Sequence, residues 1–158
     1  MFNIAIYQPL IPQNAGSAMR IAAASGTMLH FIEPLGFQLS DKKLIRSAMD
    51  YRHRAHFLVH KNWEEFNTNI QNNNPDGNIY AISTKGKKIY GDVNFKEGDT
   101  FLFGSESKGL PKPILEKFPT QRILRIPMHE DERCLNLSIS IAIILYEALR
   151  QTEFFKLQ

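Results

Sequence analysis

The stretch FNIAIYQPLIPQNAGSAMRIAAASGTMLHFIEP, residues 2–34, decides the fold. Residues 2–7 are largely apolar and β-prone, which predicts a short buried strand. The alanine-rich segment after it predicts a helix that Asn14 caps and Gly26 ends. Residues 28–33 repeat the strand pattern. A strand, a helix and a second strand in this order are typical of a parallel β-α-β unit.

The rest of the chain continues this alternation. The patterns predict a helix over 41–49, a strand over 56–60, a helix over 62–72, strands over 78–83, 100–103 and 123–126, and a helix over 136–151. A length of 158 residues suits one domain, and we find no internal repeat or linker. We therefore expect a single α/β domain, residues 1–158, with a mainly parallel sheet flanked by helices.

Composition excludes several classes of protein. A chain with 43% hydrophobic and 22% charged residues is neither disordered nor fibrous. The longest apolar stretch, 141–146, is far short of the roughly 20 residues that span a bilayer, and we see no signal peptide. The single cysteine, Cys134, cannot form an internal disulfide, which fits a cytoplasmic protein. A net charge of +3 permits a nucleic-acid partner without requiring one.

The last predicted helix is apolar on nearly all sides. A helix that packs one face on a sheet needs only an apolar stripe. The other faces are covered either by a second subunit, with Ile143 and Leu145 as candidate contacts, or by deep burial within the chain. The pattern alone leaves both explanations open. The apolar positions are Leu137, Ile139, 141–146, Ala148 and Leu149.

Three familiar kinds of site are not supported. The segment Gly104–Gly109 has the glycine spacing of a phosphate loop but lacks the Lys-Ser/Thr that follows in such loops. His53, His56 and His60 have helical spacing, but the residues between them are β-prone and no acidic or cysteine ligand lies beside them, so we expect solvated or RNA-facing histidines and no metal. For Cys134 we expect a small, half-buried side chain rather than a nucleophile.

Three segments are richer in polar and backbone-permissive residues than packing requires. Each follows a predicted strand, and ligands of parallel sheets bind at the carboxyl ends of the strands. Arg20 is expected on the inner part of its helix, where an anion such as a phosphate would suit its donors. Glu106 lies in a tight loop and requires a partner. The segments are 14–20, 103–111 and 126–138.

These segments resemble motifs of the SPOUT superfamily of RNA methyltransferases, and within it of the 2′-O-ribose methyltransferases. The matching residues are Asn14-x-Gly16-x-x-x-Arg20, Phe103-Gly104-x-Glu106-x-x-Gly109-Leu110-Pro111, and Ile126-Pro127-Met128 followed by Leu135-Asn136-Leu137-Ser138. Segments 32–37, 50–51 and 84–86 are similar to the small members that methylate the wobble nucleotide of tRNA. Two positions depart from the family: Cys134 replaces the usual Ser, and Ile139 replaces an Asn.

The resemblance implies a C-terminal trefoil knot, bound S-adenosylmethionine without a metal, and a homodimer with the last helix in its interface. The implied activity is methyl transfer to the 2′-hydroxyl of a wobble cytidine or modified uridine in the anticodon stem-loop. There are two alternatives. The protein methylates another ribose of tRNA or rRNA, or it is a homologue that binds RNA without catalytic activity. An intact set of catalytic positions argues against the silent homologue.

The resemblance also implies roles for individual residues. Arg20 would stabilise the developing alkoxide together with an RNA phosphate. The residues that would orient it, the ribose or the loops are Asn14, Glu106, Asn136 and Ser138. The cofactor pocket would comprise Ile82, Ser83, Gly104, Ser105, Glu106, Ile126, Met128, Cys134 and Leu135. From their charge alone, the candidate RNA-binding residues are Lys42, Lys43, Arg46, Arg52, Arg54, Lys85 and Lys87.

Overall fold

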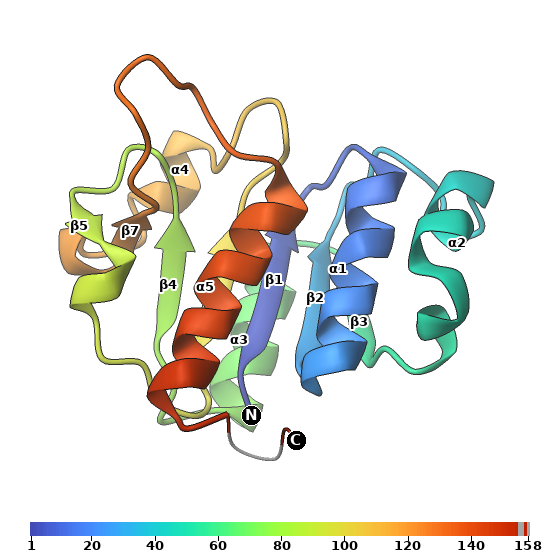
Figure 1. Cartoon of the computed structure of the whole chain (residues 1–158), viewed down its shortest axis with the longest axis horizontal. Helices are drawn as coiled ribbons and strands as arrows, with labels where there is room; N and C mark the ends of the chain where they lie inside the picture. Colours follow the sequence, from blue (N-terminus) through green and yellow to red (C-terminus); the bar gives the residue numbers. More distant parts are fainter. Residues whose placement is uncertain (155–156, 158) are drawn as a thin grey trace.

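A computed structural model gives the structure of the chain and describes residues 1–154 and 157. Its centre is a sheet of seven strands in the order β3-β2-β1-β6-β4-β7-β5, and every neighbouring pair is parallel (Figure 1). The predicted parallel α/β fold is therefore confirmed. The strands are β1 (Asn3–Tyr7), β2 (Met28–Ile32), β3 (Phe57–His60), β4 (Ile79–Ile82), β5 (Lys88–Ile89), β6 (Thr100–Phe103) and β7 (Ile123–Arg125).

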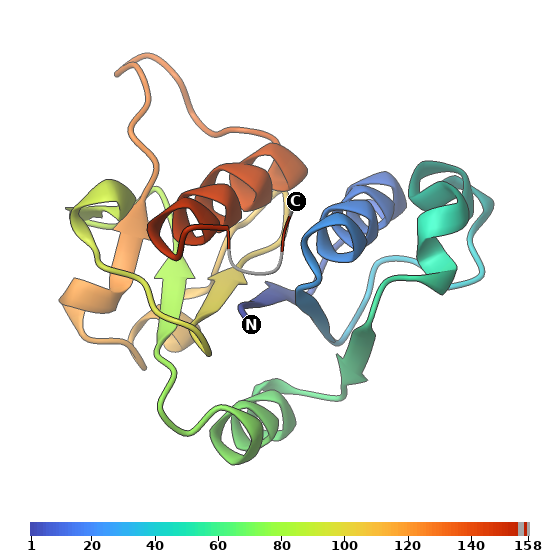
Figure 2. The same cartoon turned by 60° about the horizontal axis from the view of Figure 1, so that its bottom comes forward.

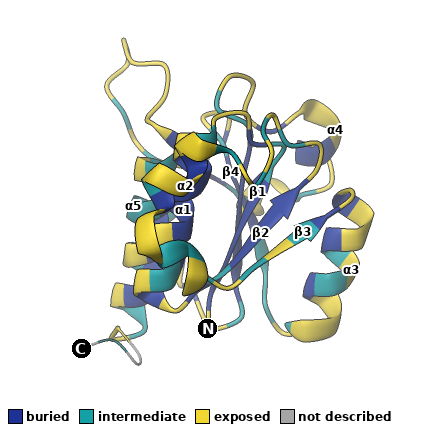
Figure 3. Cartoon of the chain, turned by 90° about the vertical axis from the view of Figure 1, so that its right-hand side faces the viewer, coloured by how far each residue is buried: buried dark blue, intermediate teal, exposed yellow. Residues whose placement is uncertain are grey.

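Helices cover both faces of the sheet. The helices α1 and α5 lie side by side on one face and α3 lies on the other, with α2 packed against the outer side of α1 (Figures 2 and 3). None of these helices, within the residues described, has the length and apolarity needed to span a bilayer. The helices are α1 (Pro12–Ser25), α2 (Lys42–Ala48), α3 (Trp63–Asn73), α4 (Lys112–Leu115) and α5 (Leu137–Gln151), with 3₁₀ turns η1 (Met49–His53), η2 (Tyr90–Asp92) and η3 (Thr120–Arg122).

The strand register brings the ends of the central strands to one edge. Phe103 at the end of β6 pairs with Ile6 of β1 on one side and with Ile82 of β4 on the other. Ile82 in turn pairs with Leu124 of β7. The three polar segments that follow β1, β6 and β7 therefore leave the sheet at the same edge, where parallel sheets bind ligands.

The start of α1 differs from the prediction. Asn14 was expected to cap the helix, but α1 begins two residues earlier at Pro12, and Ile11 occupies the cap position without a side-chain hydrogen bond. Proline suits the first helical turn because its fixed φ is already helical and it has no N–H to leave unpaired. Asn14 is thus buried inside the helix, and its side chain is free for other partners.

The predicted strands and the helices expected over 41–49, 62–72 and 136–151 are present, and the structure shows Asp41, Asn62 and Asn136 as the caps of these helices. The two-residue strand β5 and the four-residue helix α4 were not predicted. Both are too short to show a periodic pattern of apolar residues. Sequence patterns found the longer elements and missed the two short ones, although Ile114 and Leu115 of α4 are buried in the core.

Intrachain packing covers one side of α5. Six apolar residues, Leu137, Ile141, Ile144, Leu145, Ala148 and Leu149, face the core. On the other side Ile139 and Tyr146 are 53% and 44% exposed, and Ala142 and Ile143 are partly exposed. The positions 139, 142, 143 and 146 follow i, i+3, i+4, i+7 spacing and form one stripe along the helix, which we call the outer stripe.

A pair of buried histidines lies between β2, β3 and α3. His60, expected to be solvated, is only 3% exposed, and its Nε2 lies 2.9 Å from Nδ1 of His30. Phe66 packs edge-on against both rings. The prediction was wrong for His60 because β3 turns this residue towards α3, whereas His53 and His56 are exposed as expected.

Burial keeps His30 neutral. Loss of solvation, reinforced by the nearby charge of a protonated His60, lowers the pKa of His30 from 6.5 to about 3, and burial lowers the pKa of His60 as well. Between pH 6.5 and pH 3 the unfolded chain therefore binds protons that the folded chain does not. The contribution of the two neutral histidines to the free energy of unfolding is therefore complete above pH 6.5. It decreases as the pH falls through this window.

We expect urea unfolding between pH 7.5 and pH 5 to show this loss, with a slope from His30 that approaches about 1.4 kcal/mol per pH unit and a further contribution of the same sign from His60. His30→Met should reduce the slope, because one of the two depressed titrations is removed. His53→Gln is the matched control on an exposed histidine and should leave the slope unchanged. Equal slopes for wild type and His30→Met would contradict the assignment.

Candidate functional site

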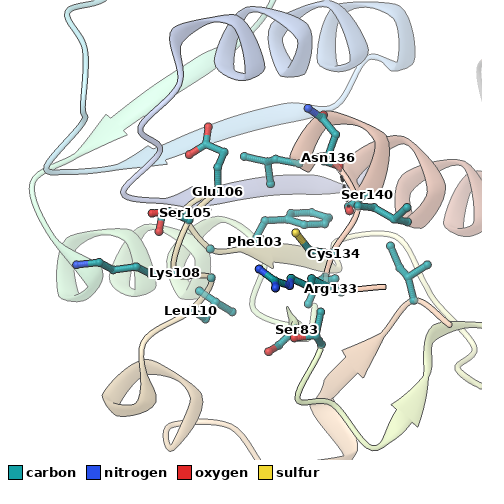
Figure 4. Close-up of a pocket in the computed structure, with 18 of the residues that line it drawn as sticks. Ser83, Phe103, Ser105, Glu106, Lys108, Leu110, Arg133, Cys134, Asn136 and Ser140 are labelled. Carbon is teal, nitrogen blue, oxygen red and sulfur yellow. Dashed lines mark hydrogen bonds between the residues drawn. The ribbon is translucent and has the colours of Figure 1, made fainter. Parts of the chain in front are cut away.

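A cavity of about 510 Å³ opens at the carboxyl edge of β4, β6 and β7 (Figure 4). Its walls come from the β1–α1 connection, the loop after β4, the loop after β6, and the long segment between β7 and α5. A volume of this size is typical of small-molecule sites. The cavity therefore lies where the three polar segments converge.

Each of the nine predicted cofactor residues lines this cavity. Asn14 and Asn136, predicted as catalytic, line it as well, and so does Lys85, which was assigned to RNA binding. Arg133 also lines the cavity but was not predicted; its side chain lies between Phe103 and Ser83 in Figure 4. Phe103 and Leu110 belong to the quoted motif and could have been included, whereas Arg133 stands in a charged loop without a distinguishing pattern.

The loop after β6 folds tightly on itself. The N–H of Gly109 donates to the carbonyl of Ser105 at 2.8 Å. At Gly104 an added Cβ would lie 2.0 Å from the carbonyl carbon of Gly109 and 2.2 Å from the nitrogen of Leu110. Only glycine allows this approach of two backbone segments, which forms the floor of the cavity.

Glu106 has the partners that its position requires. Its Oε2 accepts the N–H of Leu10 at 2.8 Å, and its Oε1 accepts the N–H of Ile11 and the side-chain amide of Asn14, each at 3.1 Å. Hydrogen bonds to a carboxylate are stronger than those between neutral groups. Glu106 therefore ties the loop after β6 to the start of α1.

A chain of hydrogen bonds continues from Glu106 to α5. Asn14 Oδ1 accepts the side-chain amide of Asn136 at 3.1 Å. Asn136 Oδ1 in turn accepts the N–H of Ser138 at 2.8 Å and its hydroxyl at 2.7 Å. The four predicted orienting residues thus form one connected network that joins α1, the loop after β6 and the start of α5.

Arg20 stands outside this network. The sequence predicted it on the inner part of α1, but Met19 and Ala22 occupy the buried side, and Arg20 is exposed and does not line the cavity. Its guanidinium carbon lies 5.5 Å from the centre of the Tyr51 ring. The prediction of its orientation was wrong because the apolar residues on either side of Arg20 turn it away from the sheet.

Cys134 is exposed rather than half-buried. It lies on the segment between β7 and α5, which has no helix or strand and stands away from the body of the molecule (Figure 1), so little covers the side chain. Among the described residues, no three His, Cys, Asp or Glu side chains gather as metal ligands would.

The predicted RNA-binding residues occupy two places. Lys42, Lys43 and Arg46 lie on α2, and Arg52 and Arg54 lie in or beside η1. Lys85 and Lys87 lie in the loop after β4, next to the cavity. All except the half-buried Arg52 are exposed, so the positive charge is available to a partner at the surface.

Comparison with known proteins gives a consistent result. The tRNA (cytidine(34)-2′-O)-methyltransferases of Methylovorus glucosotrophus and Saccharophagus degradans are each 44% identical to this chain over 154 residues, 98% of this chain and 97% of theirs. A solved structure described as "Structural insights into the 2-OH methylation of C/U34 on tRNA" is 40% identical, covers 98% of this chain and 97% of its own, and superimposes with a TM-score of 0.91. Residues 1–146 match the SpoU rRNA Methylase family. This chain therefore belongs to the SpoU rRNA methylase family.

Proposed function

We propose that this protein transfers a methyl group from S-adenosylmethionine to the ribose 2′-hydroxyl of the wobble nucleotide of tRNA, a cytidine or a modified uridine. The observation that carries the proposal is the convergence of the three motif segments on one cavity, in a chain whose full-length relatives bear the name of this activity. A cytoplasmic location is part of the same proposal, since it follows from the substrate.

The cavity suits the proposed cofactor. Apolar side chains, among them Ile82, Ile126, Met128 and Leu135, form walls against which an adenine ring can pack, and the backbone of the loop after β6 supplies polar groups. When bound, S-adenosylmethionine supplies a methyl group on a positively charged sulfur. The exposed cations Lys85, Lys108 and Arg133 are near enough to meet its carboxylate or an RNA phosphate.

The residues of the chain supply position and charge. A ribose hydroxyl is a poor nucleophile until it loses its proton, so holding it in line and stabilising the negative charge on its oxygen accelerate the transfer. We assign the stabilising charge to Arg20, which lies outside the cavity in the free chain and would meet the reacting ribose when RNA is bound. A guanidinium with a pKa above 12 acts as an electrostatic partner rather than as a base.

The Glu106–Asn14–Asn136 network serves this chemistry indirectly. Both carboxylate oxygens of Glu106 already accept N–H groups, and Asn136 holds the start of α5. We assign these residues to fixing the cavity walls relative to α1. In this proposal the network keeps the cofactor loops and the helix that carries Arg20 in register.

A second copy of the chain is proposed to cover the outer stripe of α5. Four apolar residues at helical spacing, two of them about half exposed, suit the centre of a symmetric helix-to-helix contact. The family resemblance implies the same interface and a trefoil knot. Two copies would together offer enough surface for an anticodon stem-loop, which this single small domain must otherwise hold alone.

The cluster on α2 and η1 is proposed to contact tRNA phosphates. We expect the triple variant Lys42→Gln, Lys43→Gln, Arg46→Gln to weaken tRNA binding and to reduce its dependence on salt, by roughly one unit of the logarithmic slope for each phosphate that the variant no longer neutralises. Filter binding between 50 and 300 mM salt measures both. Lys117→Gln, two residues beyond the end of α4, is the control. An unchanged slope would move the RNA site towards Lys85 and Lys87.

Methyl transfer to tRNA in vitro tests the proposal as a whole. Labelled S-adenosylmethionine, the purified protein and a tRNA with cytidine at position 34 should give label at that ribose. The same tRNA with 2′-deoxycytidine at position 34 should accept none, because the attacking oxygen is absent. Label at another ribose of tRNA or rRNA would favour the alternative substrate, and no transfer to any RNA would favour a silent binding protein.

A further inference from the structure

The ring of Tyr51 contacts Arg20, and the proposed function gives this contact no role. It is half-buried in η1, and two guanidinium groups lie over its ring: that of Arg20 at 5.5 Å from the ring centre and that of Arg54 at 4.3 Å. Both distances are within the roughly 6 Å over which a cation is attracted to an aromatic face. The Tyr51 hydroxyl makes no hydrogen bond to any described residue.

The two arginines differ in their charge partners. Arg54 forms an ion pair with Asp50 at 3.3 Å. Across the described residues, Arg20 has no carboxylate within ion-pair distance, and the Tyr51 ring is its one side-chain partner. A carboxylate would neutralise Arg20 and compete with a phosphate, whereas an aromatic face fixes the guanidinium and leaves its charge and its N–H donors available.

The ring itself is held in place relative to α1. Gly16 lets the backbone of α2 pack directly on α1, because an added Cβ would lie 2.6 Å from the carbonyl of Leu44 and 2.8 Å from the nitrogen of Ala48. Met49 then adopts a left-handed φ of 54° and turns the chain into η1. The Tyr51 carbonyl accepts the N–H groups of Arg54 and Ala55 at 2.9 and 2.8 Å.

We propose that Tyr51 is a positioning residue, whose ring holds the Arg20 guanidinium in the orientation that meets the RNA phosphate and the developing alkoxide. This rests on the proposed function, because Arg20 has a task only if the chain methylates a ribose. Tyr51 is not among the residues that line the cavity, so in this proposal it acts through Arg20. The competing possibility is that the Tyr51 ring stacks directly on an RNA base.

A double-mutant cycle on the full-length protein separates these possibilities. The variants are Tyr51→Leu, Arg20→Ala and both together, with Tyr51→Phe as the matched control that keeps the ring. Single-turnover transfer is measured at saturating S-adenosylmethionine and tRNA, and the affinity for each is measured separately. We expect Tyr51→Leu to slow transfer about fivefold with the affinity for S-adenosylmethionine unchanged, and Tyr51→Phe to stay within twofold of wild type.

The decisive result is the effect of Tyr51→Leu in the Arg20→Ala background, which we expect to be less than twofold. A fivefold loss in both backgrounds, a loss confined to tRNA affinity, or a wild-type rate for Tyr51→Leu would each overturn the proposal. The contact has its own readout: the ring should shift the NMR signals of the Arg20 δ-protons, in Tyr51→Phe but not in Tyr51→Leu. If the NMR signals of Arg20 are shifted but the wild-type protein transfers no methyl group, the proposed function is wrong. The positioning role of Tyr51 is then wrong as well, although its contact with Arg20 is real.

Discussion

Replacing Arg20 by alanine should slow methyl transfer by about a hundredfold or more at saturating tRNA and cofactor. The guanidinium is the proposed stabiliser of the alkoxide, and the loss of one donor to a developing oxyanion has effects on the order of 10² to 10³. Cofactor affinity should stay unchanged, because Arg20 does not line the cavity. Single-turnover methylation of tRNA and calorimetry with S-adenosylmethionine measure the two quantities.

Two further variants sharpen this test. Arg20→Lys should not recover the full rate, because an ammonium lacks the planar pair of donors and stacks less well on Tyr51. Arg46→Ala, on α2, is the control and should weaken tRNA binding without lowering the rate at saturation. Wild-type rates for both Arg20 variants would make Arg20 a docking residue. The catalytic role would then pass to another group, with Glu106 the next candidate despite its three hydrogen-bond donors.

The variants Ile139→Asp and Ile143→Asp should convert the protein from a dimer to a monomer. Each places a charge in the outer stripe, where its desolvation in an interface is costly. We also expect tRNA methylation to fall to background, because both copies are proposed to hold the RNA. Sedimentation at low micromolar concentration gives the mass, and the methylation assay gives the function.

Leu145 provides the contrast for this experiment. The sequence grouped it with Ile143 as a candidate contact, but it is fully buried within the chain. Leu145→Ala should therefore lower stability, by about 2–5 kcal/mol, and leave the dimer intact. The outer stripe is not the interface if the wild-type protein is a stable monomer. The same conclusion follows if the Ile143→Asp variant remains a dimer.

The arrangement of the strands, and the edge at which a ligand binds, could be predicted because they follow from local pattern, whereas the individual cofactor residues came from the resemblance to the family's motifs. The β-α-β unit of residues 2–34 has strands and a helix long enough to show their apolar periodicity, and parallel strands place their carboxyl ends together. The predicted cofactor residues fall on those ends, which is why they converge on one cavity. The glycines of the motif in residues 103–111 also predicted the tight loop that begins at Gly104.

Side-chain direction was harder to predict because packing between distant segments decides it. Asn14 looked like a cap, but Glu106 engages the N–H groups of Leu10 and Ile11 ahead of the helix, from 95 residues or more along the chain. His60 looked solvated until β3 placed it against His30. Arg20 points outward towards Tyr51. This contact joins α1 to η1, and no local pattern in the sequence predicts it.

Mass mapping of 2′-O-methylated nucleotides, in tRNA from cells with and without this protein, is the decisive measurement for the proposed function. We expect methylation at nucleotide 34 of one or more tRNAs to disappear when the protein is absent. It should return with the wild-type protein but not with Arg20→Ala. Unchanged methylation at nucleotide 34, or loss at a different ribose, would contradict the assignment of this chain to the wobble nucleotide.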